Sequence, residues 1–289
     1  MKFLIISILV ALATAESDDW YKTASFYQIY PQTFFDGGGG NRGGYGTLKG
    51  VEAKLDYIKS LGIDCIWMTP IFETTYNSFG YDITNYEEID ARFGSKEIFK
   101  QLVDAVHAKG MKIIVDFVPN HCGYEHEFFK KSVLKDSEYE NWFVWSDGKG
   151  TNKSQPPSNW QRIGKGPGSG WNYNLKRDQW FYAVFSDHMP DLNLREPKVI
   201  AYWEKFLKLW LDFGLDGFRV DAISHGFEKV LANGTYPDEE INQEVSNQDD
   251  FSYLQHTNTL DQPELFDLIY NWRGIFNSYN GSTRFVSYH

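Results

Sequence analysis

The protein has 289 residues, a length that fits one large domain or two smaller ones. Hydrophobic residues make up 42% of the chain and aromatic residues 17%, which is enough to bury a substantial core. The formal net charge of −11 and the isoelectric point near 5.1 argue against nucleic acid and against an anionic membrane surface as partners, because both attract basic proteins. A neutral small-molecule substrate is compatible with this charge.

Residues 1–15 have the layout of a secretory signal peptide, with Lys2, a short apolar run and small residues that end at Ala15. The apolar run is shorter than the ~20 residues of a membrane-spanning helix, so we expect cleavage after Ala15 and no transmembrane segment. Three glycosylation sequons agree with a secreted protein and begin at Asn152, Asn233 and Asn280.

The two cysteines, Cys65 and Cys122, do not form the disulfide framework that stabilises small secreted domains. A secreted chain could join them, and two free thiols in the core are an equally good interpretation. The sequence leaves both open.

Short apolar β-type runs alternate with helical stretches in the first part of the chain. The expected elements are a strand at 26–30, a helix at 51–61, a strand at 65–68, a helix at 96–109 closed by Gly110, and a strand at 112–118. Near-continuous apolar strands separated by helices predict a parallel sheet with both faces covered.

The pattern changes at 121–187, which is rich in Gly, Asn, Ser and Trp and has no clear periodicity. We interpret this stretch as an inserted, loop-rich subdomain. The alternation then resumes with a helix at 198–213, a strand and its exit at 218–223, a long irregular or helical stretch, and a candidate fifth strand at 284–288.

Alternation of strands and helices fits either a doubly wound sheet or a barrel. No glycine-rich phosphate-binding motif follows a strand, and the glycine run at 37–40 lacks the Lys-Ser/Thr ending of a phosphate loop. Nucleotide binding is therefore not predicted.

Polar residues gather just past the predicted strands. In a parallel barrel the carboxyl ends of the strands form the active face. The candidate site residues are Tyr81, Asp82, His121, Arg219, Asp221 and His225.

Arg219 and Asp221 lie two residues apart, so along a strand both side chains point to the same face. A guanidinium beside a carboxylate lowers the pKa of that carboxylate and keeps it ionised, as a nucleophile requires. Alone, the pair could be a structural ion pair, and His121 a hydrogen-bonded loop histidine. Four polar clusters at successive strand ends favour a site. No His or Cys spacing predicts a metal site.

Three segments resemble conserved blocks of the α-amylase superfamily, glycoside hydrolase family 13. They are Asp116–His121, Gly217–His225 and Met189–Asn193, the last in the form typical of α-glucosidases and oligo-1,6-glucosidases. The resemblance extends from about Asp19 to the end of the chain and is strongest to insect maltases and sucrases of the gut.

This resemblance implies an α/β fold, the (β/α)8 TIM-barrel catalytic domain, with a loop-rich domain inserted after the third strand. The implied divisions are 1–15 for the signal peptide, 16–120 for the first part of the barrel, 121–187 for the inserted domain and 188–289 for the continuing, truncated barrel.

The resemblance also implies a retaining double displacement, with Asp221 as nucleophile and Arg219 holding it ionised. His121 and Asp82 would hold the hydroxyls of the terminal glucose. Tyr81 would contribute to substrate binding, and His225 would lie near the leaving sugar.

The chain departs from the family pattern in three places. A retaining glycosidase needs a second carboxyl group about 5–5.5 Å from the nucleophile, which the family supplies as a Glu at the fifth strand end. Here residues 284–289 contain no Glu, and about five strands are present. Second, relatives often bind a metal ion such as calcium in the loop after the first strand, but residues 36–42 contain one carboxylate, so no cofactor is predicted. Third, Asn85 stands where relatives usually have Asp.

These departures lead to the hypothesis that the 289 residues are an incomplete product, which would unfold non-cooperatively or aggregate because half a barrel exposes its edges.

Two functions remain. The first is a secreted, exo-acting α-glucosidase that hydrolyses maltose, sucrose or short oligosaccharides, in the gut lumen or saliva if the insect resemblance holds. The second is a non-catalytic relative that binds sugars or a partner protein. Amino-acid transporter heavy chains share the scaffold but carry a transmembrane helix before it.

Overall fold

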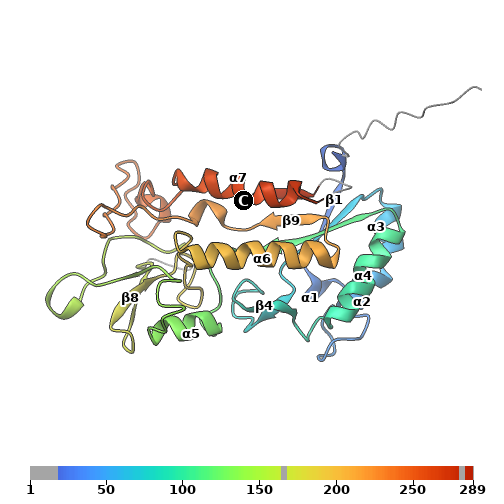
Figure 1. Ribbon diagram of the computed structural model, residues 1–289, viewed down its shortest axis with the longest axis horizontal. Coiled ribbons are helices and arrows are strands. Elements are labelled where there is room, and N and C mark those ends of the chain that lie inside the picture. Colours follow the sequence, from blue (N-terminus) through green and yellow to red (C-terminus); the bar gives the residue numbers. More distant parts are fainter. Residues whose placement is uncertain (1–18, 164–167, 280–283, 289) are drawn as a thin grey trace, which may run out of the picture.

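The computed structural model describes residues 19–163, 168–279 and 284–288 (Figure 1). The predicted signal peptide and the sequon at Asn280 lie outside these ranges. Within them, no helix is long and apolar enough to cross a bilayer.

A sheet of five parallel strands forms the centre of the molecule, in the order β1-β2-β5-β9-β10. Each strand pairs with the sheet strand that follows it in the chain. A barrel has this order, whereas a doubly wound sheet reverses its order at a switch point. The strands are β1 (Phe26–Ile29), β2 (Cys65–Met68), β5 (Lys112–Phe117), β9 (Gly217–Val220) and β10 (Phe285–Tyr288).

The sheet is strongly curved. The ring of Phe26 on β1 lies 5.1 Å from the ring of Phe285 on β10, although these are the two outermost strands. Trp20, just before β1, also contacts Phe285, at 5.9 Å between ring centroids. Side chains of the outer strands can meet in this way only if the sheet bends round, as part of a barrel does.

Helices cover the outside of the sheet, and α6 and α7 run alongside β9 (Figure 1). The helices are α2 (Leu48–Ala53), α3 (Leu55–Ser60), α4 (Lys96–Ala108), α6 (Pro197–Phe213) and α7 (Glu264–Asn277). The core between helices and strands is aromatic: Trp203 and Phe206 of α6 and Trp272 of α7 pack on Phe117 of β5. Ser95 caps the start of α4 through a hydrogen bond from the Ile98 amide.

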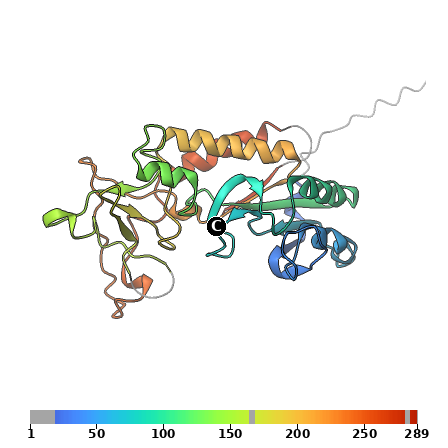
Figure 2. The ribbon, with the colours of Figure 1, turned by 90° about the horizontal axis from the view of Figure 1, so that it is seen from below.

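A second, antiparallel sheet, in the order β6-β8-β7, lies within the predicted insertion and occupies one end of the molecule (Figure 2). Its strands are β6 (Trp145–Ser146), β7 (Trp171–Asn174) and β8 (Gln179–Tyr182). It has its own small apolar cluster around Trp160 and Trp171, onto which Tyr236 from the segment after β9 packs. The insertion therefore packs around a small core of its own, separate from the core of the parallel sheet, and this explains why it interrupts the strand–helix pattern. The boundaries at 121 and 187 stay a prediction.

The remaining elements are short. They are β3 (Phe72–Thr74) and β4 (Ile83–Ile89), which form an antiparallel pair, the helices α1 (Pro31–Phe34) and α5 (Glu127–Val133), and the 3-10 turns η1 (Trp20–Lys22), η2 (Thr151–Lys153), η3 (Ile223–His225) and η4 (Phe251–Tyr253).

The α/β class and the parallel strands are confirmed, while one expected helix differs and further local detail is added. The helix expected at 51–61 is two helices that meet at Lys54, and the β3–β4 pair was not predicted. Within the strand and exit expected at 218–223, the strand itself ends at Val220, because Ala222 adopts a left-handed φ of 54° that a strand cannot continue through. Cys65 and Cys122 are both buried and unpaired.

Candidate active site

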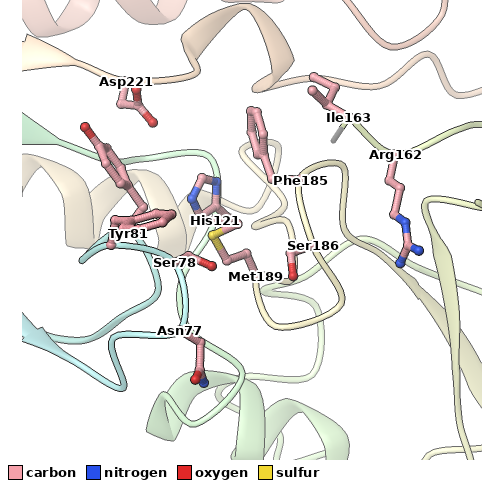
Figure 3. A pocket seen from close by; sticks show the side chains of 11 residues that line it. Asn77, Ser78, Tyr81, His121, Arg162, Ile163, Phe185, Ser186, Met189 and Asp221 are labelled. Carbon is pink, nitrogen blue, oxygen red and sulfur yellow. The ribbon is translucent and has the colours of Figure 1, made fainter. Parts of the chain in front are cut away.

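A cavity of about 600 Å³ lies beyond the carboxyl ends of the parallel strands (Figure 3). Three of the predicted site residues line it: Tyr81 from the β3–β4 connection, His121 after β5 and Asp221 after β9. The rest of the wall comes from the same connection, from the insertion and from the segment just after it, and consists of Asn77, Ser78, Phe79, Arg162, Ile163, Phe185, Ser186 and Met189. Asp221 and Tyr81 lie on the side opposite Arg162 (Figure 3).

Asp221 forms an ion pair with the Nη1 atom of Arg219, as the two-residue spacing predicts. The side chains are 19% and 16% exposed, so the pair is poorly screened by water. Burial disfavours the Arg219 cation, but the two carboxylates of Asp116 and Asp221 outweigh it and raise the pKa of Arg219. A permanent cation therefore stabilises the ionised form of Asp221.

Asp116 connects the site residues and was not predicted to have a role. It is fully buried and accepts hydrogen bonds from Trp67 Nε1, at 2.6 Å, and from the Tyr81 hydroxyl, at 2.8 Å. Arg219 Nη1 lies 3.4 Å from its Oδ2 atom. Burial raises the pKa of Asp116 to about 6, against the opposing pull of Arg219. The available signals were an acidic residue near the end of the largely apolar β5 and its place at the start of the segment Asp116–His121, which resembles a family block.

His121 presents a neutral imidazole. Burial lowers its pKa to about 3, so the ring is uncharged at neutral pH. Its Nδ1 atom lies 3.4 Å from the Asn120 side-chain nitrogen, and among the described residues its Nε2 atom has no hydrogen-bond partner. A buried nitrogen without a partner, on a cavity wall, is suited to a ligand hydroxyl.

Asp82 and His225 do not line the cavity. The Asp82 carboxylate is fully buried and binds its own loop. The ring of His225 contacts the ring of Phe185, with 5.2 Å between centroids, and burial lowers the pKa of His225 to about 4. Of the six predicted residues, the structure therefore brings four together. Tyr81, His121 and Asp221 line the cavity, and Arg219 contacts Asp221.

In the loop after β1, the backbone holds the carboxylate of Asp36. The two carboxylate oxygens of Asp36 accept the amides of Gly38, at 2.9 Å, and Gly44, at 3.0 Å. Across the described ranges, no group of three or more His, Cys, Asp or Glu is placed to hold a metal ion.

Comparisons with known proteins agree with the geometry. The sequence profile described as alpha amylase, catalytic domain, matches residues 28–287. The salivary alpha-glucosidase of Aedes aegypti is 40% identical over 278 residues, and maltase A2 of Drosophila melanogaster is 43% identical over 264 residues. The alignments cover 96% and 90% of this chain but 47% and 46% of those proteins, so the chain spans about half the length of these relatives.

The crystal structure of the alpha-glucosyl transfer enzyme XgtA superposes with a TM-score of 0.82 at 33% identity, over 93% of this chain and 49% of that one. The match therefore includes both the curved sheet and the insertion. From the profile match over residues 28–287, the chain belongs to the family of the α-amylase catalytic domain.

Proposed function

We propose that this chain contributes the glucose-binding wall and the nucleophile of a retaining α-glucosidase. One observation carries the proposal: Asp221, paired with Arg219, shares the wall of a sugar-sized cavity with the neutral, unpartnered His121. Asp221 would attack the anomeric carbon of the terminal glucose, and the bond from that carbon to the leaving oxygen would break. Arg219 stabilises the carboxylate before attack, and Asp116 fixes Arg219 and Tyr81 around it.

The leaving oxygen needs a proton from a second carboxyl group. Asp221 is the one carboxylate among the described residues that line the cavity. The proton donor is therefore a residue outside this set, and hydrolysis of natural glucosides depends on its presence.

An α-glucosyl fluoride tests the nucleophile separately from the acid, because fluoride leaves without being protonated. A 5-fluoro derivative slows hydrolysis of the ester and lets the covalent adduct accumulate. We expect mass spectrometry to find one fluoroglucosyl group on the peptide that contains Asp221, and none in Asp221→Asn.

Asp64→Asn is the matched control, since Asp64 accepts from Ser25 at the amino end of β2, at the other end of the sheet from the cavity. It should label like the parent chain. Labelling that persists in Asp221→Asn would remove Asp221 from the role.

The substrate proposal, maltose, sucrose and short oligosaccharides, is supported by relatives named maltase and alpha-glucosidase. Calorimetric titration with maltose and sucrose tests it directly. A chain that binds neither sugar but is labelled by the fluoride would contradict these substrates and keep the nucleophile.

We also propose that the protein is secreted, because a relative is described as salivary and residues 1–15 resemble a signal peptide. Asn152 and Asn233 are exposed and open to glycosylation. Expression in insect cells should place a chain that begins at Glu16 in the medium. Retention of the whole product in the cells would contradict secretion.

A second candidate is a sugar-binding protein without catalysis. The single carboxylate of the cavity wall favours it. Affinity for maltose without any labelling by the fluoride would support this function over the first.

A further inference from the structure

A second cavity, of about 670 Å³, is formed by the β3–β4 pair, by α5 with the chain that follows it, and by α6. Figure 1 shows α5 and β4 on the same side of α6. Among the described residues, this cavity shares no lining side chain with the candidate active site. We propose that it binds a neutral sugar unit, as a carbohydrate site in addition to the cavity that holds Asp221. The inference goes beyond the proposed function, because it concerns a different surface of the chain.

His126, the residue just before α5, brings a buried N–H donor to the wall of the second cavity. The side chain is 4% exposed, and its Nδ1 atom accepts the Phe128 amide at 3.1 Å. Burial lowers the pKa of His126 to about 3, so the ring is neutral at neutral pH. Because Nδ1 is the acceptor, the proton of the neutral ring lies on Nε2. This Nε2 atom has no hydrogen-bond partner among the described residues.

Trp142 supplies a second donor of the same kind. It is 5% exposed and lines the cavity, and within the described part of the chain its indole Nε1 atom has no hydrogen-bond partner. The Phe128 ring packs on both donors, with 4.0 Å between centroids to His126 and 4.5 Å to Trp142, and so holds them in place. Buried N–H groups without an acceptor are rare because they are costly, so a ligand that accepts from them would be stabilised here.

The charges around the cavity decide which acceptor fits. The side chains that line it include five Glu and two Lys, so phosphate, sulfate and carboxylate ligands are repelled. Glu138 forms an ion pair with Lys198 at 3.3 Å, which leaves lone pairs on its carboxylate for a further donor. The ligand must therefore accept from N–H groups and donate to carboxylates without carrying a negative charge. Alcohol hydroxyls do both.

Aromatic rings form the rest of the site. Phe128, Tyr139 and Tyr202 line the cavity and are partly exposed, so they offer apolar faces to the C–H groups of a sugar ring. Cavities of about 300–1,000 Å³ with aromatic walls and a few placed polar groups are typical of small-molecule sites. An ammonium ligand would also suit rings and carboxylates, but it would leave His126 and Trp142 without an acceptor. A neutral sugar satisfies the donors, the carboxylates and the rings together.

Nuclear magnetic resonance of the indole N–H groups tests the site in the whole chain. Each signal is assigned by its loss in the corresponding Trp→Phe variant. We expect maltotriose to shift the Trp142 signal saturably and to leave unchanged the signals of Trp203 and Trp272, which do not line the cavity. A Trp142 signal that stays in place throughout the titration would overturn the proposal.

A variant that fills the cavity separates binding there from indirect effects. Ala201 is exposed and lines the cavity, so the ring added in Ala201→Trp would occupy the site without removing a contact. Leu209→Trp is the matched control, because Leu209 is exposed on the same helix and lies outside the cavity wall. We expect Ala201→Trp to abolish the shift of the Trp142 signal and Leu209→Trp to retain it. A shift that survives in Ala201→Trp would be evidence against this site.

Trp142→Phe measures the contribution of one donor and decides alone if Ala201→Trp does not fold. In this variant binding is followed at the Phe128 amide, which lies beside the cavity. Affinity for maltotriose should fall about threefold to tenfold, in line with the loss of one neutral hydrogen bond. Equal affinity in Trp142→Phe and the parent chain would show that the indole donor does not bind the sugar.

Tetramethylammonium is the probe for a cationic ligand, and a cavity that binds it but not maltotriose would refute the sugar assignment. The glucosyl fluoride keeps this test apart from the proposed function. Ala201→Trp should be labelled at Asp221 like the parent chain, whether or not the second cavity binds sugar. Loss of labelling in Ala201→Trp would contradict two independent sites.

Discussion

At the residue scale, the buried acids outside the cavity matter as much as those on its wall. Glu228 is 3% exposed, and burial raises its pKa from the usual 4.5 to about 8 despite the nearby Arg195. Asp191, fully buried, has a pKa raised well above its usual range by burial and by Glu228. Burial therefore favours the protonated form of Glu228 at neutral pH.

Glu228→Gln should change how stability depends on pH. The native state keeps the Glu228 proton up to pH about 8, while the unfolded chain loses it near 4.5. Stability from this group is thus present below 4.5 and is lost as pH rises to 8, at up to about 1.4 kcal/mol per pH unit. Urea titrations at several pH values should show this fall in the parent chain and a flatter curve in the variant. Parallel curves would contradict the assignment.

Asp116→Asn should loosen the residues that support Asp221, because Asp116 lies outside the cavity wall and contacts Arg219 and Tyr81. The variant keeps the volume of the side chain but loses the negative charge shared by Trp67, Tyr81 and Arg219. We expect a loss of about 1–3 kcal/mol in the free energy of unfolding and slower labelling of Asp221 by the glucosyl fluoride. Equal labelling rates in Asp116→Asn and the parent would show that Arg219 needs no support.

At the element scale, the contact of β9 with β10 depends on a residue without a side chain. A Cβ atom on Gly217 would lie 1.9 Å from the carbonyl oxygen of Phe285, its partner in the parallel register. Close approach of two strands explains why glycine begins β9.

Gly217→Ala should therefore force the strands apart and cost about 1–3 kcal/mol or more, as overpacking does. Gly274→Ala in α7 is the matched control, because a Cβ there meets no atom within 4 Å. Alanine favours a helix over glycine by about 0.5–1 kcal/mol, so the control should be slightly more stable than the parent. Thermal melts of the two variants should shift in opposite directions.

At the scale of the whole molecule, a buried carboxylate ties the amino ends of the strands together. Asp216, just before β9, is 2% exposed and binds His107 of α4 at 2.8 Å and Lys112 of β5 at 3.1 Å. The Ile113 amide donates to it at 3.0 Å. This end of the sheet is stabilised by charge, and the opposite end carries the cavity.

Asp216→Asn should destabilise the whole fold by about 1–3 kcal/mol, the usual cost of removing a buried hydrogen-bonded charge whose cationic partners are partly exposed. Burial raises the pKa of Asp216, but its hydrogen bonds and cations outweigh this and lower it below 3.8. Its contribution is therefore present above pH 3.8 and is lost as pH falls further. The parent should lose stability in acid more steeply than the variant. An equal loss of stability at low pH in the parent and in the variant would show that the contacts of Asp216 do not stabilise this end of the sheet.

Much of this protein was determined by its sequence alone. Apolar runs separated by helical stretches predicted the parallel strands, because a strand that is buried on both faces needs a nearly continuous run of apolar residues in its own local sequence. The spacing of Arg219 and Asp221 predicted their ion pair, and the position of His121 after β5 predicted its place on the cavity wall.

Only the tertiary structure decided which polar residues face the cavity. Asp82 follows the same kind of polar pattern as His121, and the loop donors around its carboxylate are brought there by folding. The bridging role of Asp116 likewise depends on Trp67 and Tyr81, which come from other segments of the chain. Side-chain partners across strands and loops follow from packing in three dimensions, and no local pattern encodes them.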